Sequence, residues 1–389
     1  MRRALQLSAK SEPPSLPATE PVGSGTDLMR IFASTPLYVQ GPGALAAVGG
    51  IAARMGHRPT IVIDAQLRGL LIDKLQAGFA LPARFIDFSG EVTDASISQL
   101  AQASAMSDVI VAAGGGKVLD AGKAVAFQLG LPVISAPTIA SNDGPASRGI
   151  AIYDDSHRLV RVDQMPTNPA AVVVDTLVIA RAPARFLRAG IGDAIAKTFE
   201  AEACWAGTGL NKHGTRSTHS ARAIALAAYH MLREHAADGL RAVERREVTE
   251  ALEATVEACI LLSAMGFENG GLSIAHSVTR GLMTLRGARH RLHGEHVAYG
   301  TLVQLAVEER TEDLADLAGF LHQLGLPVSL AALDVDSVTF EEITAIAADA
   351  MTSPHMASFA YPLGPIVIER AIRHVEAHAA RHLAQRTHI

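Results

Sequence analysis

The sequence contains little cysteine and few aromatic residues, and it has no long apolar run. Two cysteines, Cys204 and Cys259, occur among 389 residues, and Phe, Trp and Tyr together make up 4%. Both cysteines lie in helix-like apolar patterns, which favours two buried thiols in a reducing cytoplasm over a disulfide scaffold. Because no segment reaches the roughly 18 uninterrupted apolar residues of a membrane span, we expect no membrane partner.

Positive charge is scarce as well. The chain has 34 Lys and Arg against 39 Asp and Glu, which gives a net charge of −5. This balance leaves no basic stripe for nucleic acid, so no nucleic-acid partner is expected.

Hydrophobic residues, in contrast, account for 49% of the chain, enough for a large core. A chain of this length is expected to form about two domains.

The N-terminal segment, residues 1–35, has a composition unlike the rest. It combines four prolines with a cluster of serine and glycine. Such a segment buries too little apolar surface to fold by itself. We therefore expect a disordered N-terminal extension, and a presequence or a partner-binding arm remain alternatives.

Short apolar strands alternate with helical patterns between residues 36 and 181. Strands are expected near residues 37–40, 58–64, 83–88, 109–113, 131–136 and 170–175, together with a β-hairpin that ends at residues 152–153. This alternation predicts a parallel sheet covered by helices, which is typical of a nucleotide-binding α/β domain. From residue 182 to 389 apolar residues recur at intervals of three and four. The second domain is therefore predicted to be helical, with a ligand-binding cleft between the two domains.

The most informative stretch runs from Val109 to Lys123. A β-branched strand ends in Gly114, Gly115 and Gly116, and residues at helical spacing follow. Because glycine has no Cβ, an oxygen-rich ligand can approach the backbone, and the first N–H groups of the helix would bind its negative charge. Lys117 would add a positive charge. A plain connection from strand to helix is the alternative.

Asp64 ends an earlier strand that is expected to be buried. A carboxylate at a strand end near a phosphate-binding turn accepts both hydroxyls of an adenosine ribose and repels a 2′-phosphate, which favours NAD over NADP. Capping of the following helix is the alternative. No GxGxxG follows the first strand, so the pattern differs from the usual dinucleotide fingerprint.

Three polar residues in the helical half could hold a metal ion. Asp193 is a lone acid in an apolar helix start, where an unpaired carboxylate would be costly to bury. His276 lies among apolar residues in an expected helix that follows Gly270 and Gly271. His293 belongs to the next histidine-rich segment. No two of them form a His-x-x-x-His pair, so a surface or core role for each histidine stays open.

Five segments match a known family in the same order along the chain. These enzymes are bacterial glycerol dehydrogenases of the metal-dependent (iron-containing or zinc) alcohol dehydrogenase superfamily, to which dehydroquinate synthase and glycerol-1-phosphate dehydrogenase are related. The resemblance extends from about residue 37 to the C-terminus. The segments that resemble the family motifs are AAGGGKVLDAGKAVA, APTIASNDGPAS with AIY after it, GIGDAIAKTFEAEAC, GFENGGLSIAHSV and HGEHVAYGTLVQL.

The resemblance implies a fold and a set of site residues. A Rossmann-like, dehydroquinate synthase-like α/β domain with a parallel sheet would precede an all-α domain, with the active site in the cleft between them. Asp193, His276 and His293 match the family's metal ligands, and Asp64 matches its ribose-binding acid. The other matched cofactor positions are Gly114, Gly115, Gly116, Lys117 and Asp120 at the pyrophosphate, and Thr138, Ser141, Asp143, Ser147, Gly149 and Tyr153 on the nicotinamide and adenosine side.

The same resemblance implies an NAD-dependent and metal-dependent dehydrogenase. A bound metal would acidify a hydroxyl of glycerol or a related small vicinal diol, and hydride transfer to the nicotinamide would give the hydroxyketone, or the reverse. Asp143 would bind the second hydroxyl as a further catalytic residue. His290 would be a proton relay or, more simply, a surface group. The resemblance also implies a homo-oligomer, from a dimer to an octamer.

Some positions depart from the family pattern. Lys197 stands four residues after Asp193, where iron-type members have a histidine ligand. Three protein ligands favour Zn²⁺ over Fe²⁺ or another divalent metal. Asn142 and Gly144 replace the Thr and Ala of many glycerol dehydrogenases. Arg148 could meet a phosphate or carboxylate of the substrate, although alternation in the hairpin would turn it outward.

Three alternatives to a glycerol or diol dehydrogenase therefore stay open. The first is a dehydrogenase of a phosphorylated or acidic substrate such as glycerol 1-phosphate. The second is a non-redox cyclase or lyase that uses NAD only transiently, as dehydroquinate synthase does, and would accumulate no NADH. The third is a metal-free binding protein, which would contain no divalent ion.

Overall fold

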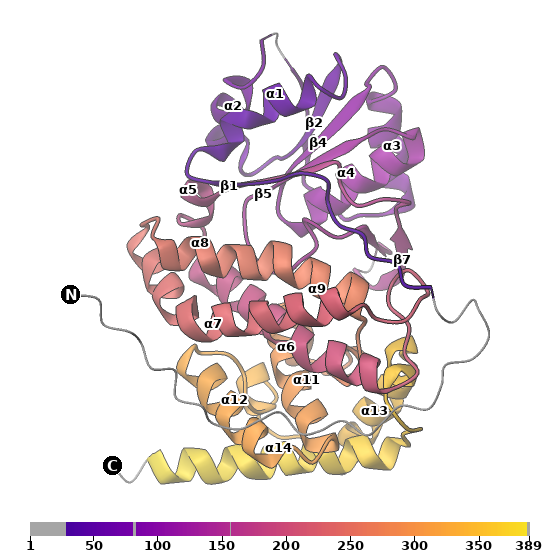
Figure 1. The fold of residues 1–389 in the computed structure, drawn as a ribbon, viewed down its shortest axis with the longest axis vertical. Helices are drawn as coiled ribbons and strands as arrows, with labels where there is room; N and C mark the ends of the chain where they lie inside the picture. Colours follow the sequence, from indigo (N-terminus) through magenta and orange to yellow (C-terminus); the bar gives the residue numbers. More distant parts are fainter. Residues whose placement is uncertain (1–28, 81–82, 156, 387–389) are drawn as a thin grey trace.

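A computed structural model gives the fold of residues 29–80, 83–155 and 157–386. Figure 1 shows an α/β region stacked on a helical region, with the last helix along the far side of the helical region. The first 28 residues of the predicted N-terminal extension lie outside the described residues.

Six parallel strands form the sheet of the α/β region, in the order β1-β8-β5-β4-β2-β3. All neighbouring strands pair in parallel, which confirms the predicted sheet. The carboxyl ends of the strands therefore lie at one edge, where ligands bind in such sheets. The strands are β1 (Tyr38–Gly41), β2 (Pro59–Asp64), β3 (Arg84–Phe88), β4 (Val109–Gly114), β5 (Val133–Pro137) and β8 (Ala171–Asp175).

A separate hairpin consists of β6 (Gly149–Tyr153) and β7 (Leu159–Gln164). The sequence predicted that the hairpin ends at Tyr153, and this is wrong because Tyr153 ends its first strand. The four residues 159–162 of the second strand are exposed, although valine and arginine alternate there. An exposed strand of this kind lacks the buried apolar run that identified the other strands.

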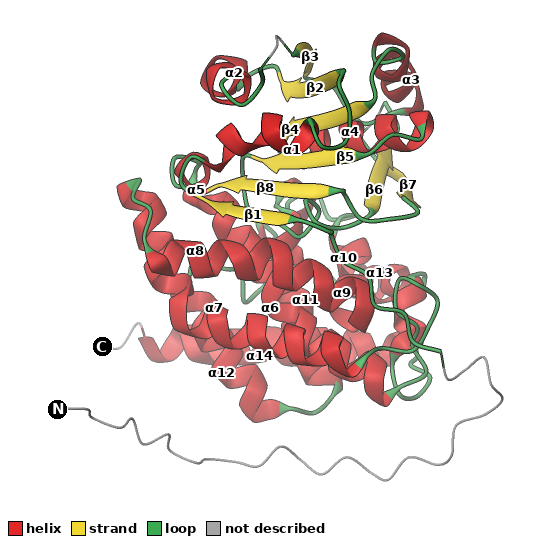
Figure 2. Cartoon of the chain, turned by 45° about the horizontal axis from the view of Figure 1, so that its top comes forward, coloured by secondary structure: helices red, strands yellow, loops and turns green. Residues whose placement is uncertain are grey.

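The sheet is covered on both faces, as Figure 2 shows. Ile61 and Ile63 of β2 pack on one face with the helices that follow β1 and β2, whereas Val62 between them packs on the other. This alternation is the two-residue period of a strand buried on both sides. One face carries η1 (Ala44–Ala47), α1 (Val48–Ala52) and α2 (Arg68–Gln76), and the other carries α3 (Asp94–Ala103) and α4 (Gly116–Leu129).

Helices alone build the chain from residue 176 to 386, as predicted for the second region. Val172 and Val174 of β8 belong to the same core cluster as these helices, so the sheet packs directly on the helical region. Bounds are α5 (Thr176–Ile179), α6 (Ala184–Ala206), α7 (His219–Arg245), α8 (Glu250–Glu257), η2 (Ala258–Leu262), α9 (Ser263–Gly270), α10 (Ile274–Leu282), η3 (Ala288–His290), α11 (His293–Val307), α12 (Thr311–Gln323), η4 (Ala331–Leu333), α13 (Phe340–Met351), η5 (Pro354–Ser358) and α14 (Pro365–Arg386).

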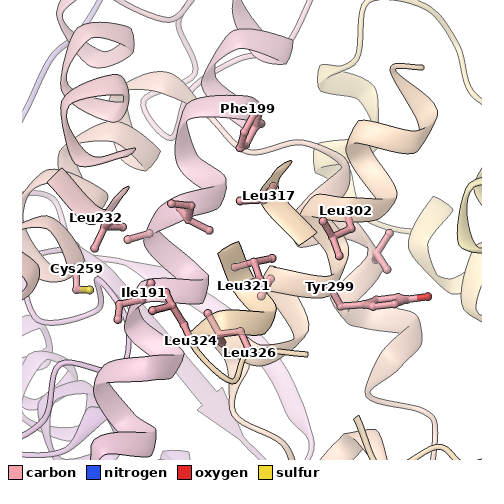
Figure 3. Packing of buried hydrophobic residues seen from close by; sticks show 14 of the residues in the cluster. Ile191, Phe199, Leu232, Cys259, Tyr299, Leu302, Leu317, Leu321, Leu324 and Leu326 are labelled. Atoms are coloured by element: carbon pink, nitrogen blue, oxygen red, sulfur yellow. The ribbon is translucent and has the colours of Figure 1, made fainter. Parts of the chain in front are cut away.

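Helix α6 lies at the centre of the helical core. Figure 3 shows Ile191 and Phe199 of this helix among side chains of the neighbouring helices, with Leu232 from α7 and Leu321 from α12. Because α6 is covered on nearly all sides, any polar side chain on it has to find its partners inside the protein.

Two further features concern the chain as a whole. Among the described residues no single helix is long and apolar enough to cross a membrane; one pair bent by 103°, residues 250–270 with 274–282, meets that test by length and composition. Residues 29–35 contact the helical region, for example where the Ile31 amide donates to Thr215 Oγ1 at 3.1 Å. The prediction of a disordered extension therefore does not hold for these seven residues.

Candidate metal centre and dinucleotide cleft

Two glycines allow α6 to approach its neighbours closely. A Cβ on Gly190 would lie 2.1 Å from the carbonyl oxygen of Ala140, and a Cβ on Gly192 would lie 2.4 Å from that of Gly294. Helix α6 can therefore touch both the loop after β5 and the first turn of α11. This packing brings Asp193, the residue after Gly192, next to polar groups from both elements.

Asp193, His276 and His293 come together although they lie on α6, α10 and α11. One ligand atom from each lies within 4.8 Å of the others. Asp193 Oδ1 is 3.3 Å from His276 Nε2 and 3.8 Å from His293 Nε2, and the buried Asp193 Oδ2 has no hydrogen-bond partner. A carboxylate and two imidazoles with an orphaned oxygen fit a divalent metal held by three protein ligands. The His293 side chain is 45% exposed and that of Asp193 only 1%, so the site opens on the His293 side.

Glu200 orients His276. Its Oε2 lies 2.6 Å from His276 Nδ1, and its Oε1 accepts the backbone N–H groups of Ser273 and His276 at 2.8 and 3.1 Å. Burial opposes protonation, yet the carboxylates of Glu200 and Asp193 raise the pKa of His276 above its ordinary value. A carboxylate on Nδ1 leaves Nε2 as the metal-facing atom, the usual arrangement around histidine ligands.

Lys197 places its ammonium group against the same atoms. Nζ lies 2.7 Å from Asp193 Oδ1, 3.1 Å from His276 Nε2 and 3.2 Å from Asp143 Oδ2. Burial alone would lower the pKa of Lys197, but Asp143 and Asp193 raise it, so the lysine is charged. Asp143 is fixed from the other side by the Ser263 hydroxyl at 2.8 Å. Ser263 directly follows the π-helical turn η2, a feature frequent at functional sites.

The predicted Gly turn lies at the carboxyl edge of the sheet. β4 ends at Gly114, Gly115 caps α4 and Gly116 is the first residue of the helix. A Cβ on Gly116 would meet nothing within 4 Å, so the N-terminus of α4 is open to a ligand. Asp64 ends the neighbouring strand β2. Its carboxylate accepts the Gln66 amide at 2.9 Å, whereas Leu67 stands at the N-cap position of α2 and no side chain caps the helix, so the alternative that Asp64 caps this helix is wrong.

The loop after β5 connects the Gly turn to the metal ligands. The Thr138 amide donates to the Gly114 carbonyl at 3.0 Å, and the buried Thr138 hydroxyl has no partner. Ser141 is half-buried and Ser147 buried, and between them Asp143 reaches Lys197. Residues 138–143 thus extend from the turn to the metal ligands. Two small molecules bound side by side could therefore contact the turn and the metal ligands at the same time.

Comparison with known proteins now identifies the family. The family described as iron-containing alcohol dehydrogenase matches residues 39–183. The glycerol dehydrogenase of Pseudomonas putida is 40% identical over 314 residues, which cover 79% of this chain and 86% of that protein. That of Thermotoga maritima is 40% identical over 319 residues, covering 80% of this chain and 86% of that protein. The chain belongs to the iron-containing alcohol dehydrogenase family.

The fold comparison agrees with this membership. The crystal structure of glycerol dehydrogenase from Schizosaccharomyces pombe has 32% sequence identity and a TM-score of 0.88, and the match covers 92% of this chain and 93% of that chain. The resemblance to glycerol dehydrogenases noted in the sequence is therefore confirmed. As a member of the alcohol dehydrogenase family, the chain is an oxidoreductase that acts on CH–OH groups.

Not every predicted cofactor residue of this alcohol dehydrogenase lies at the Gly turn. The exposed Lys117 ammonium pairs with Glu91 at 2.7 Å. Glu91 in turn lies 2.6 Å from His157 Nδ1, and its pKa is lowered, because these hydrogen bonds outweigh burial. Tyr153 donates its amide to the Val92 carbonyl, and burial raises the pKa of Tyr153 to about 12. In this structure the Lys117 ammonium group is therefore paired with Glu91.

Asp120 forms contacts with other parts of the α/β region. It lies 2.8 Å from the fully buried Lys123 and accepts the Ala151 amide at 3.2 Å. Lys123 also donates to the carbonyls of Gly144 and Gly149. Sequence reasoning missed Lys123, whose three contacts fix the ends of the segment 144–149 on α4. Gly149 enters this arrangement through its carbonyl oxygen.

Arg148 and His290 had alternative roles at the sequence level. His290 is exposed and its Nε2 accepts from Arg289 at 3.1 Å, as expected of a surface group. Arg148 was expected to turn outward in the hairpin, and this is wrong. The residue precedes β6 and is half-buried, donates its side chain to the Lys212 carbonyl and its amide to Glu268 at 2.8 Å. It connects the two regions of the alcohol dehydrogenase.

Proposed function

We propose that this alcohol dehydrogenase oxidises glycerol or a related small vicinal diol to the hydroxyketone with NAD⁺, and catalyses the reverse reduction. The single observation that carries the proposal is the convergence of Asp193, His276 and His293 within 4.8 Å, joined to the Gly turn by one short loop. Forty per cent identity to glycerol dehydrogenases over most of the chain supports the same substrate class.

A divalent metal would be held by Asp193, His276 and His293. When bound, it supplies a Lewis acid that favours the deprotonated form of a substrate hydroxyl. We propose zinc, because Lys197 stands where iron-type relatives have a fourth ligand, and three protein ligands suit a catalytic zinc. Glu200 holds His276 with Nε2 toward the site.

The dinucleotide would be held by the open N-terminus of α4 at Gly114–Gly116, with Asp64 at the ribose. When bound, NAD⁺ accepts the hydride that the carbinol carbon loses, while the hydroxyl proton is released and the C=O bond forms. The backbone N–H groups of the first turn of α4 bind negative charge. The orphaned Thr138 hydroxyl offers a further hydrogen bond at the end of β5.

Asp143 would orient the substrate. Its Oδ2 is held by Ser263 and Lys197, which leaves Oδ1 as an acceptor without a partner in the described part of the chain. The second hydroxyl of a vicinal diol can donate to this oxygen. Because two groups on the helical region fix the carboxylate, the diol would be positioned without loss of side-chain freedom on binding.

We also infer a homo-oligomer that works in a reducing compartment, the cytoplasm. Both thiols of the described chain, Cys204 and Cys259, are free and buried, and burial raises the pKa of Cys204 to about 12. The oligomer rests on the family resemblance alone. Sedimentation of the purified chain would measure it, and a monomer would contradict it.

The proposed function is tested by NADH absorbance on metal-loaded enzyme with glycerol and 1,2-propanediol. We expect NADH formation, its loss in Asp193→Asn and His276→Ala, and unchanged rates in the surface control His290→Ala. Metal analysis should find about one zinc per chain. If no alcohol or diol reduces NAD⁺, the dehydrogenase proposal fails, and substrate turnover without NADH would favour a cyclase or lyase.

A further inference from the structure

Lys212 is an exception among the lysines of the described residues that surround the cleft. Lys117, Lys123 and Lys197 each have a carboxylate oxygen within 3.2 Å. Lys212 forms no ion pair in this part of the chain, and its Nζ lies 3.3 Å from His355 Nε2. Burial is the main cause that lowers the pKa of Lys212. An ammonium group is thus half-buried, and among the described residues an imidazole is its side-chain hydrogen-bond partner.

This pair lies beside the metal ligands. Lys212 Nζ is 5.5 Å from the centre of the Phe267 ring, and Lys197 Nζ is 5.6 Å from the same centre. His355 belongs to η5, which packs against α10, the helix that carries His276. The Phe267 ring therefore lies close to two ammonium groups, that of Lys197 at the metal site and that of Lys212 at its edge.

The neighbouring carboxylates are already engaged. Glu200 binds His276 and the Ser273 amide. Glu268, the next acid along this wall, accepts the Arg148 amide at 2.8 Å and a hydrogen bond from the Asn168 side chain. Neither comes within ion-pair distance of Lys212. The described residues thus leave this ammonium group without a carboxylate at ion-pair distance.

Burying an ammonium group without an opposite charge is costly unless another group compensates it. A divalent metal at Asp193 would increase the local positive charge further. The two lysines and the metal would then carry four positive charges against the four surrounding carboxylates, Asp143, Asp193, Glu200 and Glu268, none of which forms an ion pair with Lys212. An anion bound at Lys212 would give this ammonium group an ion pair, whereas a neutral hydroxyl would not.

We propose that Lys212, with His355, binds an oxyanion of the substrate, a carboxylate or a phosphate carried next to the carbinol that is oxidised. This inference rests on the proposed function, because it names the class of CH–OH substrate that the same site prefers. His355 is neutral in the free protein, since burial and the Lys212 charge lower its pKa to about 3. It accepts the hydrogen bond of Lys212 and holds the ammonium in place for the anion.

The experiment compares neutral and anionic substrates of one size on metal-loaded enzyme. Glycerol is paired with glycerate, which carries a carboxylate, and with glycerol 1-phosphate and glycerol 3-phosphate. The variants are Lys212→Met, Lys212→Arg and the surface control Lys74→Met. Isothermal titration of glycerate and of each glycerol phosphate into the holoenzyme gives a readout that does not depend on turnover.

We expect kcat/KM for at least one anionic substrate to exceed that for glycerol. Lys212→Met should lower the ratio of the anionic to the neutral kcat/KM by about 10- to 100-fold, the usual effect of one charge-assisted hydrogen bond. Lys212→Arg should restore part of the ratio, and Lys74→Met should leave it unchanged. The comparison of glycerate with the two glycerol phosphates decides whether the site binds a carboxylate or a phosphate.

Three results would overturn the inference. Glycerol could be oxidised while no anion is turned over or bound, which would leave the proposed function intact. Lys212→Met could lower the rates with glycerol and with the anions by the same factor, which would make the lysine structural. Lys212→Met could also bind the anions as tightly as the parent enzyme does. Failure of every alcohol, neutral or anionic, would instead count against the proposed function.

Discussion

Lys197 competes with a metal for the same oxygen and nitrogen atoms. Its ammonium contacts Asp193 Oδ1 and His276 Nε2, two of the atoms that would ligate a divalent ion. An ammonium group and a metal cation at neighbouring positions would repel each other, so a bound metal would favour the contact of Lys197 with Asp143 over that with Asp193. In the metal-free protein the same lysine neutralises two buried carboxylates.

Replacement of Lys197 by methionine should therefore lower the stability of the metal-free protein and raise the affinity of the protein for zinc. The metal-free protein should lose about 3–5 kcal/mol of stability, because Asp143 and Asp193 are left without their cation. Zinc affinity should rise by about tenfold or more, since one competing charge is removed. Thermal unfolding in EDTA and competition with a zinc chelator measure the two quantities, with Lys74→Met as the control. An unchanged or weaker zinc affinity would show that the lysine supports the metal.

Single residues differed in how far the sequence could predict them. Asp193 and His276 stood out as polar side chains in apolar helices, and the structure brings them together with His293. Glu200 lies seven residues after Asp193 on α6, which puts it on the same helix face, so this signal was present and overlooked. Lys212 and His355 are 143 residues apart, and only the fold could bring them together.

At the scale of elements, the β4–turn–α4 unit determines how a dinucleotide could bind. Gly122 lies against β4, where an added Cβ would be 2.4 Å from that of Ala112, whereas Gly116 faces open space. The helix is thus packed tightly along its length and open at its N-terminus. This combination suits an anion that approaches the backbone while the helix stays fixed.

Gly116→Val should weaken dinucleotide binding with little effect on the fold. An added Cβ at Gly116 meets no protein atom within 4 Å, so the valine side chain would extend into the open space at the first turn of α4. We expect the Kd for NADH to rise at least tenfold by fluorescence titration, with a change in stability below about 1 kcal/mol from helix propensity. Gly319→Val in α12, where the added Cβ also meets nothing, is the matched control. Equal NADH affinity in the two variants would contradict a cofactor at this turn.

Buried strands were predicted well because their apolar runs are continuous, as in residues 109–113 of β4. The strand β7 was missed because its residues 159–162 are exposed on both faces. Lys117 was expected to face the phosphate from its position alone. Its pairing with Glu91 depends on how α4 lies beside the loop before α3, which no local pattern contains.

At the scale of the whole molecule, residues 29–35 join the two regions. Ala33 exchanges two hydrogen bonds with the side chain of Asn269, at 2.7 and 2.9 Å, and the Thr35 hydroxyl donates to the Pro169 carbonyl at 2.8 Å. Arg30 stacks on the ring of Trp205 at 4.7 Å. Composition alone placed these residues in a disordered extension, because the partners that hold them lie more than 130 residues away.

The same segment forms a wall of a cavity of about 510 Å³. Ile31, Ala33, Arg148 and Lys212 are among the residues that line it. Lys212, which carries the proposed oxyanion subsite, lines the same cavity as this segment, so the segment limits the access of solvent to that lysine. Loss of the segment would hydrate the ammonium group and weaken its attraction for an anion.

Two truncations separate the contribution of residues 29–35 to stability from that of residues 1–28. Deletion of residues 1–35 should lower stability by about 1–3 kcal/mol relative to deletion of residues 1–28, because only the longer deletion removes the hydrogen bonds of Ala33 and Thr35 and the Arg30 stacking. Thermal unfolding of both variants at one scan rate measures the difference. If the proposed subsite exists, the longer deletion should also lower the ratio of anionic to neutral kcat/KM, because it exposes Lys212. Equal thermal midpoints in the two truncations would show that the contacts of residues 29–35 do not hold the two regions together.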